Sequence, residues 1–336
     1  MAKPQLHSCQ LMARALSIFL GTLLSLGFPL SAECKTWYVS LQPSPPKRGE
    51  RPAKGEAWSN PYKGFSEIDW KKVNSGDTIM VDGNKTGNVM LYNEPLTIRK
   101  SGITVTTSAE ADHAGFAVIS GTGRHGTGIE FLSNQNVQII GRAMPPKEGE
   151  PQNSIIVTRW DSWGVNIGPA AGGTILRHVN LYNNSGPGGA GARIAAQKVS
   201  FANVNLMNSR LDLAVPDQPG PTFTNCWFSA GPYALYAVDG IHVLNALGST
   251  VLFNFQSCIF GPCFRRALVF ERENGTLKLE DCLFINSLNV NIEKGKGDHT
   301  TMTFDFDRIT SFLTSLNFYH KGHTNMNFTV GGDSVR

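Results

Sequence analysis

Three carboxylates, Asp239, Glu271 and Glu293, recur at corresponding places in the C-terminal half of the sequence. Each lies at the end of a predicted short strand, so we expect them to stack on successive strands about 4.8 Å apart. Like charges at this spacing repel one another unless a cation or basic groups lie beside them. The column therefore predicts a site for a cation or for basic groups; the alternative is three ordinary solvated strand ends. The basic residues nearby in the sequence are Arg265, Arg266, Lys294, Lys296, His320 and Lys321.

A second candidate is segment 159–164, with the sequence Arg-Trp-Asp-Ser-Trp-Gly. It comes directly before a predicted strand and places Trp160, Asp161 and Trp163 near one face of the fold. Exposed indole rings suit stacking on sugar rings, whereas the alternative is that they cover the flank of the fold. We take these three residues, together with Arg265, as candidate substrate-binding residues.

Charge and motifs argue against several other functions. The sequence carries 30 basic and 26 acidic side chains, so its composition gives no argument for a nucleic acid or an anionic membrane as partner. No Gly-rich phosphate loop, zinc-binding motif or Ser-His-Asp arrangement is recognisable in the sequence.

The elements that must position the candidate residues form a repeat. The segment Phe255–Pro262 consists of a short apolar strand, a polar residue and a second apolar strand. This pattern recurs at intervals of 22 to 32 residues, which is typical of solenoid proteins. Short alternating strands without helical segments between them predict one coil of β-structure per repeat. The other copies are 176–183, 201–208, 223–230, 279–286 and 304–310.

We expect three strands in each coil: a first strand, followed by the two strands of the repeated pattern. The first strands alternate apolar and polar residues, so one face points into the coil and the other points out. The polar residues between second and third strands are expected to form a structural column, because such residues tolerate tight turns. They are His178, Asn203, Asn225, Ser257, Asp281 and Asp307. The expected first strands are 164–167, 192–195, 211–215, 234–238, 266–271, 288–293 and 316–320.

The first 32 residues predict a signal peptide. Lys3 and Arg14 form a basic region, residues 16–30 are mostly apolar, and Ala32 ends a cleavage-site pattern. The alternative is a membrane anchor, but Gly and Pro interrupt the apolar run, which falls short of about 18–20 residues. We therefore expect a secreted or periplasmic protein whose mature part, 33–336, is one domain without a membrane span.

Cysteine placement predicts free thiols in the core. Export permits disulfides, but Cys226, Cys258 and Cys282 occupy the same position in successive repeats. Side chains stacked about 4.8 Å apart are slightly too distant for a relaxed disulfide, so we expect a column of small buried residues. The alternative is a metal site, which lacks His or carboxylate partners at ligand spacing.

One helix is predicted, at 64–74, with Ser66 as a candidate N-cap and Gly76 beyond its end. The segments around it, together with the repeats, resemble secreted right-handed parallel β-helix proteins of the pectate-lyase-like superfamily, in particular the chondroitinase-B and alginate-lyase type. The segments that carry the resemblance are Tyr38-Val-Ser40, Asn60-Pro-Tyr62, Gly76-Asp-Thr-Ile79, Leu96-Thr-Ile98, Val118-Ile-Ser-Gly121 and Val137-Gln-Ile-Ile-Gly141.

The resemblance covers roughly residues 36–330 and implies an all-β fold, a right-handed parallel β-helix in which the short N-terminal helix caps the open end of the coil. It also implies an acidic polysaccharide bound along the first strands. Carboxylates, often with Ca²⁺, would neutralise a uronate group, and a Lys or Arg would remove its C5 proton. On this basis Arg266 and Lys294 are the candidate catalytic residues, and the carboxylate column described above supplies the candidate calcium ligands.

The sequence also departs from the family pattern. It lacks a Lys and Arg pair in the context of chondroitinase-B-type lyases and the paired-Asp motifs of polygalacturonases, so no catalytic role is transferred by motif. It ends directly after a predicted second strand, so we expect the coil to be short of a C-terminal cap. Two functions remain: a lyase that cleaves uronate-containing glycan by β-elimination, or a non-catalytic protein that binds glycan or another surface. We expect a monomer in either case.

Overall fold

The described part of the chain includes neither the predicted signal peptide nor several later segments. The computed structural model describes residues 33–122, 125–145, 152–184, 190–215, 219–229, 239–243, 250–261, 266–270, 274–285, 290–291, 293–294, 300–312, 316–317 and 324–335. The chain divides into two units, 1–34 and 35–336, and the description below concerns the second. No helix among the described residues is long and apolar enough to cross a membrane.

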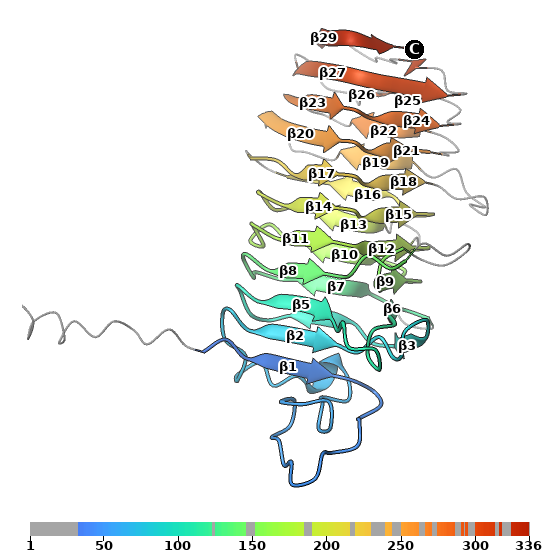
Figure 1. The fold of residues 1–336 in the computed structure, drawn as a ribbon. Coiled ribbons are helices and arrows are strands. Elements are labelled where there is room, and N and C mark those ends of the chain that lie inside the picture. The colour runs from blue at the N-terminus through green and yellow to red at the C-terminus, as the bar shows by residue number, and fades with distance from the viewer. Residues whose placement is uncertain are drawn as a thin grey trace, which may run out of the picture. The chain divides into compact units, whose positions relative to one another are not determined.

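Three parallel sheets, which we call A, B and C, make up the second unit (Figure 1). Sheet A contains β1 (Thr36–Val39), β2 (Thr78–Val81), β5 (Thr104–Thr107), β8 (Gln138–Ile140), β11 (Ile175–Arg177), β14 (Ser200–Ala202), β17 (Thr222–Thr224), β20 (Thr250–Gln256), β23 (Asn274–Glu280), β27 (Thr300–Phe312) and β29 (Thr324–Val335). Sheet B contains β3 (Val89–Tyr92), β6 (Phe116–Ser120), β9 (Ile155–Thr158), β12 (Val179–Tyr182), β15 (Asn205–Met207), β18 (Trp227–Ser229), β21 (Ile259–Phe260), β24 (Leu283–Ile285) and the end of β27.

Sheet C contains β4 (Leu96–Ile98), β7 (Thr127–Phe131), β10 (Trp163–Ile167), β13 (Ala190–Ile194), β16 (Leu211–Leu213), β19 (Asp239–Val243), β22 (Arg266–Phe270) and β26 (Glu293–Lys294). A further pair, β25 (Val290–Asn291) and β28 (Leu316–Asn317), lies outside these sheets. From β4 onward the chain visits C, A and B in turn, and each strand pairs in parallel with its counterpart one coil later. This is the predicted right-handed parallel β-helix, with first strands in sheet C and the repeated pattern in sheets A and B.

The core is built from like residues stacked on successive coils. Phe223 and Phe255 stack face to face with ring centroids 4.6 Å apart, and Phe260 and Phe284 do the same at 4.7 Å. Aromatic rings of this size dominate the burial of apolar surface. The repeat pattern therefore predicted the core, because equivalent residues of successive repeats stack on one another.

The predicted thiol column is also present. Cys226, Cys258 and Cys282 are free and buried, and the Sγ of Cys258 points at the backbone oxygen of Phe223, 3.5 Å away. The neighbouring thiol Cys226 and burial both raise the pKa of Cys258 well above its usual range. These cysteines act as small core residues, and an unreactive thiol is what their environment favours.

The turn between sheets A and B uses a left-handed residue in every described coil from β11 onward. Five of the six predicted positions are confirmed, but the last member is Arg308 and not Asp307. The amide of Asn203 donates to the oxygen of Thr224 in the next coil at 3.0 Å, so the backbone carries the ladder here. The residues with φ of 50–53° are His178, Asn203, Asn225, Ser257, Asp281 and Arg308.

The predicted capping helix at 64–74 is present only as a single 3₁₀ turn, η1 (Phe65–Glu67). Ser66 is not the N-cap; instead the carboxylate of Glu94 accepts the amides of Phe65 and Ser66 at 2.6 and 3.3 Å. Ile68 ends the turn in an extended conformation and is buried. So short a segment has little helical stability of its own, so its contacts with the coil decide its conformation.

Candidate functional site

One row of polar side chains crosses sheet C, and we call it the polar row. Backbone pairing places its members directly beside one another on six successive strands, from β4 to β19. They alternate with buried apolar residues such as Val165 and Ile167, so they belong to the outward face. The members are Thr97, Glu130, Asn166, Arg193, Asp212 and His242.

Three adjacent members of the row, Glu130, Asn166 and Arg193, combine a carboxylate, an amide and a cation beside an indole ring. Asn166 donates to Glu130 through Nδ2 at 3.2 Å. Arg193 holds its guanidinium 5.3 Å from the ring centre of Trp163, which is a favourable cation–π distance. The described residues offer no hydrogen-bond partner to the buried Asn166 Oδ1 or Trp163 Nε1. Unpaired buried polar atoms are costly, so a hydroxyl-rich ligand reaching them would gain energy.

The C-terminal half contains a charged triplet. Arg210, directly before β16, donates to both oxygens of Asp212, at 2.5 Å from Nε and 3.0 Å from its second nitrogen. His242 Nδ1 lies 4.0 Å from Asp212 Oδ1. The side chains of Asp212 and His242 are only 5% and 13% exposed. A carboxylate held in this way beside a histidine is an arrangement that suits proton transfer.

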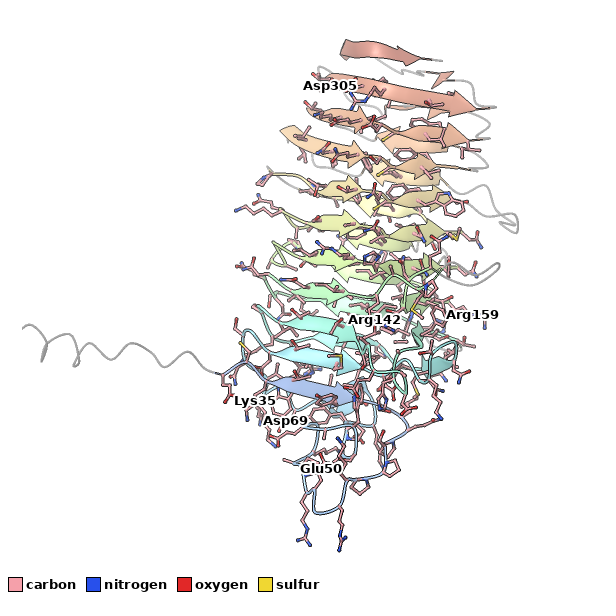
Figure 2. The ribbon with its side chains drawn as sticks, viewed as in Figure 1. Lys35, Glu50, Asp69, Arg142, Arg159 and Asp305 are labelled. Carbon is pink, nitrogen blue, oxygen red and sulfur yellow. The ribbon has the colours of Figure 1, made fainter. Side chains whose placement is uncertain are left out.

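Segment 159–164 differs from its prediction at one of its tryptophans. Trp160 is 2% exposed, and its indole N–H donates to the oxygen of Ile119 at 3.2 Å, so it fills the core and cannot stack on a sugar. Arg159, by contrast, is exposed at the flank of the coil (Figure 2). Sequence alone did not separate the two indoles, because both flank the same turn. Trp163 is the partly exposed one.

Asp161 holds the neighbouring loop in place. Its carboxylate accepts the amide of Gly126 at 2.7 Å and a hydrogen bond from His125. The Gly126 amide, followed by His125, lowers the pKa of Asp161 below its ordinary value. The observed role is thus structural, and its predicted role in substrate binding stays a prediction.

The predicted carboxylate column does not align. Asp239 was expected at the end of a first strand over 234–238, a range outside the described residues. Instead, Asp239 begins β19 and pairs with Arg266. Glu293 pairs with Val269 and, through it, with His242. Asp239 and Glu293 are therefore three residues out of register. The error arose because two apolar runs flank residue 239 and either could form the strand.

The remaining predicted site residues are described only in part. Glu271 and Arg265 lie outside the described residues. Arg266 opens β22 beside Asp239, and Lys294 pairs with Phe270; their predicted catalytic role stays a prediction. No group of three His, Cys, Asp or Glu suited to a metal occurs in the described residues. Calcium binding therefore stays a prediction, and no step below depends on it.

The polar row was missed, although part of its signal was in the sequence. Asn166, Arg193 and Asp212 are the outward residues of three correctly predicted first strands. Aligning those strands side by side would have revealed them. His242 could not have been found in this way, because its strand had been placed five residues too early.

Comparison with known proteins supports the fold. No protein-family model matches the sequence, and no curated protein sequence matches it significantly. The crystal structure of pectate lyase Pel9A superposes with a TM-score of 0.50 and 13% identity, covering 90% of this chain and 79% of the lyase. A likeness at this identity shows the fold alone: this chain has the β-helix fold of a pectate lyase.

Two other solved structures have TM-scores below that value. A rhamnogalacturonan lyase gives 0.47 with 12% identity, covering 88% of this chain and 87% of that one. The lacto-N-biosidase of family GH136 from Eubacterium ramulus gives 0.46 with 9% identity, covering 88% and 68%. We draw no argument about activity from either.

Proposed function

We propose that the protein binds an extended acidic polysaccharide along sheet C and cleaves it by β-elimination at the polar row. The observation that carries the proposal is the alignment of Arg193, Asp212 and His242 on three adjacent strands. Such cleavage needs a cation for the uronate carboxylate and a base for the proton on the neighbouring carbon. Both kinds of group are present in the row.

The spacing of the row suits a polymer of sugars. Adjacent parallel strands lie about 4.8 Å apart, which is close to the length of one sugar unit in an extended chain. Glu130 and Asn166 offer an acceptor and an amide to sugar hydroxyls. Trp163, with Arg193 over its ring, offers an apolar surface beside a positive charge. A linear ligand lying across the strands would meet each group in turn.

The chemistry assigns one step to each charged residue. Arg193 pairs with the uronate carboxylate and makes the proton on the adjacent carbon more acidic. His242 accepts that proton, the electron pair of the broken C–H bond forms a C=C bond, and the glycosidic oxygen leaves from the next carbon and takes up a proton from water. His242 then returns its proton to water. Asp212, held by Arg210, lies beside His242 and positions its ring.

This function agrees with export of the protein. A polysaccharide of this kind is an extracellular substrate, and the predicted signal peptide at 1–32 would deliver the enzyme to it. Secretion and carbohydrate binding are part of the same proposal.

A second candidate is glycan binding without cleavage. The low exposure of the His242 side chain, 13%, favours it, because a catalytic base must reach the proton it removes. The two candidates share a binding surface and differ only in turnover.

The test uses the full chain with pectate, alginate and chondroitin as separate substrates. Ultraviolet absorbance of the unsaturated uronate product reports cleavage, and calorimetry reports binding. We expect His242→Gln to lower the cleavage rate by roughly 100-fold or more while leaving binding in place. We expect Arg193→Ala to weaken binding and cleavage together. Repeating the assay with a chelator tests the separate calcium prediction.

Matched controls lie on another part of the coil. Arg177, on β11 of sheet A, is exposed, so Arg177→Ala removes an arginine without touching the row. His178 occupies a left-handed turn position at which the next two coils have Asn203 and Asn225, so His178→Asn should fold normally. Binding that is unaffected by Arg193→Ala would overturn the proposal. Binding without any product from all three glycans would select the non-catalytic candidate.

A further inference from the structure

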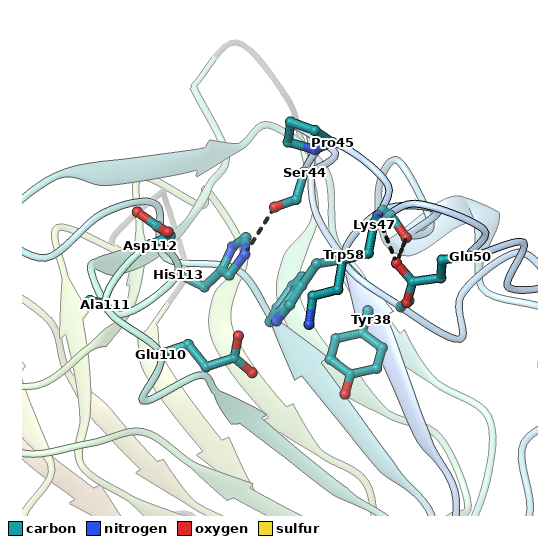
Figure 3. A pocket seen from close by; sticks show the side chains of 12 residues that line it. Tyr38, Ser44, Pro45, Lys47, Glu50, Trp58, Glu110, Ala111, Asp112 and His113 are labelled. Atoms are coloured by element: carbon teal, nitrogen blue, oxygen red, sulfur yellow. Dashed lines mark hydrogen bonds between the residues drawn. The ribbon is translucent and has the colours of Figure 1, made fainter.

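A pocket of about 390 Å³ opens between the N-terminal loop and the segment that joins β5 to β6, and its lining residues are not members of the polar row (Figure 3). Its walls come from two stretches, 38–59 and 110–113, that are far apart in sequence. Trp58 forms one wall and stacks on His113 with ring centroids 4.0 Å apart. Tyr38 packs edge-on against the same indole at 4.7 Å. The aromatic contacts fix the position of the His113 ring.

Three residues here form a Ser, His, Asp chain. Ser44 Oγ lies 3.2 Å from His113 Nε2, and His113 Nδ1 lies 3.1 Å from Asp82 Oδ2. The second contact is within ion-pair distance, but His113 Nδ1 makes no hydrogen bond within the described part of the chain. Catalytic hydrogen bonds are often poorly aligned before substrate binds. With Nδ1 protonated toward Asp82, Nε2 accepts the Ser44 proton.

The carboxylate is the most firmly held member of the chain. Asp82 is 2% exposed, and His113 is 6% exposed. Asp82 accepts from the hydroxyl of Ser40 and the amide of Asn84, both at 2.6 Å. A buried carboxylate with this support stays oriented toward the His113 ring. Ser44, by contrast, lies in the partly exposed loop at the pocket mouth, where a substrate can reach it.

We propose that Ser44, His113 and Asp82 are the nucleophile, base and orienting acid of an esterase site, separate from the polar row. Nucleophile, base and orienting group within hydrogen-bond reach of one another are the arrangement that activates a serine. Ser44 lies 69 positions before His113, and Asp82 lies 31 positions before it. No local sequence motif therefore predicted the site.

The reaction balances with water as the only co-reactant. Ser44 Oγ attacks the ester carbonyl carbon and its proton passes to His113 Nε2. The C–O bond to the alcohol breaks, and the alcohol leaves with that proton. Water, losing a proton to His113, then attacks the acyl-serine; the acid is released and Ser44 regains its proton. Lys47 lines the same pocket (Figure 3). Its positive charge can stabilise the developing oxyanion.

The pocket indicates the class of ester. A volume of about 390 Å³ lies near the lower end of the usual range for ligand sites, and it must also admit part of the alcohol, so the acyl group is short. Glu50, Glu110 and Asp112 line the pocket beside Lys47. These polar and charged groups suit an ester of a hydroxyl-rich alcohol, and they disfavour a long-chain lipid.

The test uses the full chain and p-nitrophenyl esters of acetate, butyrate and octanoate. We expect acetate to be hydrolysed above the buffer rate and octanoate poorly or not at all. Ser44→Ala and His113→Gln should each lower kcat/KM by roughly 100-fold or more. A fluorophosphonate should label Ser44, as peptide mass spectrometry would show, and the label should vanish in Ser44→Ala.

A serine outside the pocket provides the control. Ser66 is exposed and is not one of the pocket-lining residues, so Ser66→Ala should leave hydrolysis and labelling unchanged. Because His113 is buried, thermal unfolding of each variant checks folding, and the decision rests on Ser44→Ala. Labelling at another serine, or hydrolysis unaffected by Ser44→Ala, would overturn the proposal. Glycan cleavage should be the same in Ser44→Ala as in the unmodified protein, which separates this site from the polar row.

Discussion

The N-terminal coils and the later repeats are held together in different ways. Between β1 and β6 the buried polar groups are connected individually: Asp77 accepts from the Lys35 amide, the Trp37 indole and the Asn74 amide, all at 2.8 Å. From β11 to β27 the same positions recur in each coil, and Phe223 and Phe255 stack on their own counterparts. The first region gains specificity from unique contacts, and the second gains stability from repeated ones.

This difference teaches where a site can arise in a solenoid. A repeated contact is the same in every coil, so it produces columns, and columns suit long linear ligands. A unique contact joins distant residues once, as Asp82 and Ser44 are joined through His113, and it can create a single enclosed pocket. The polar row, with one residue on each of six adjacent strands, belongs to the repeated kind. The esterase pocket belongs to the unique kind.

Truncation of a stacked phenylalanine should have the largest effect. Phe255 is 1% exposed and lies between other rings, so Phe255→Ala leaves a cavity and should cost about 3–5 kcal/mol. Urea unfolding followed by circular dichroism measures the loss. Leu252, on the same strand but 38% exposed, is the control, and Leu252→Ala should cost far less. Equal losses would show that stacking does not dominate the repeats.

Removal of the Asp77 charge should come next. Asp77→Asn lowers the acceptor capacity, and each buried donor left unpaired costs roughly 1–3 kcal/mol. Burial alone would raise the pKa of Asp77, but the bonds from Lys35, Trp37 and Asn74 lower it below its ordinary value. Its contribution to stability is therefore complete above the unfolded value, about 3.9, and is lost as pH falls through the lower folded value.

Urea unfolding at neutral pH and at successively lower pH tests this. The difference between the unmodified protein and Asp77→Asn should shrink as pH falls. Asp69, which is partly exposed and accepts the Lys71 amide at 3.2 Å beside an ion pair with Lys72 at 3.6 Å, provides the control. If Asp69→Asn has the same cost, the N-terminal coil does not depend on its unique contacts.

A turn-column residue should have a smaller effect, specific to backbone conformation. Asn203 has φ of 53°, where a residue with a β-carbon and no polar side chain is strained by about 1–2 kcal/mol. Asn203→Ala should therefore destabilise the coil, whereas Asn203→Gly should cost less because glycine adopts this conformation freely. Thermal unfolding of the two variants compares them directly. Equal destabilisation would place the role of Asn203 in its side chain and not in its backbone.

The same contrast explains how much the sequence predicted. Cys226, Cys258 and the turn residues were found because each contact joins equivalent positions, so periodicity alone reveals the partner. Nothing periodic joins Ser44 to His113, and their meeting depends on how an irregular loop folds over the coil. Such a contact needs coordinates.

Two intermediate cases mark the boundary. Trp160 and Trp163 have the same residue type and similar neighbours, yet one is in the core and the other borders the polar row. Asp239 was aligned with Glu293 by pattern, but the paired strands are offset by three residues. Shifts of a few residues in a strand move every side chain to a new partner, so site predictions fail before fold predictions do.

The smallest effect on stability should come from substitution of Asp161. Asp161 holds the loop at Gly126 against the start of β10, and its pKa lies below the ordinary value because of the Gly126 amide and His125. Asp161→Asn should lower the thermal midpoint slightly at neutral pH. The difference should disappear as pH falls below the unfolded value, about 3.9, and through the folded one. Since this loop borders Trp163, Asp161→Asn should weaken glycan binding only if the loop helps to position that ring. Binding that falls while stability does not change would restore the predicted role of Asp161 as a direct ligand.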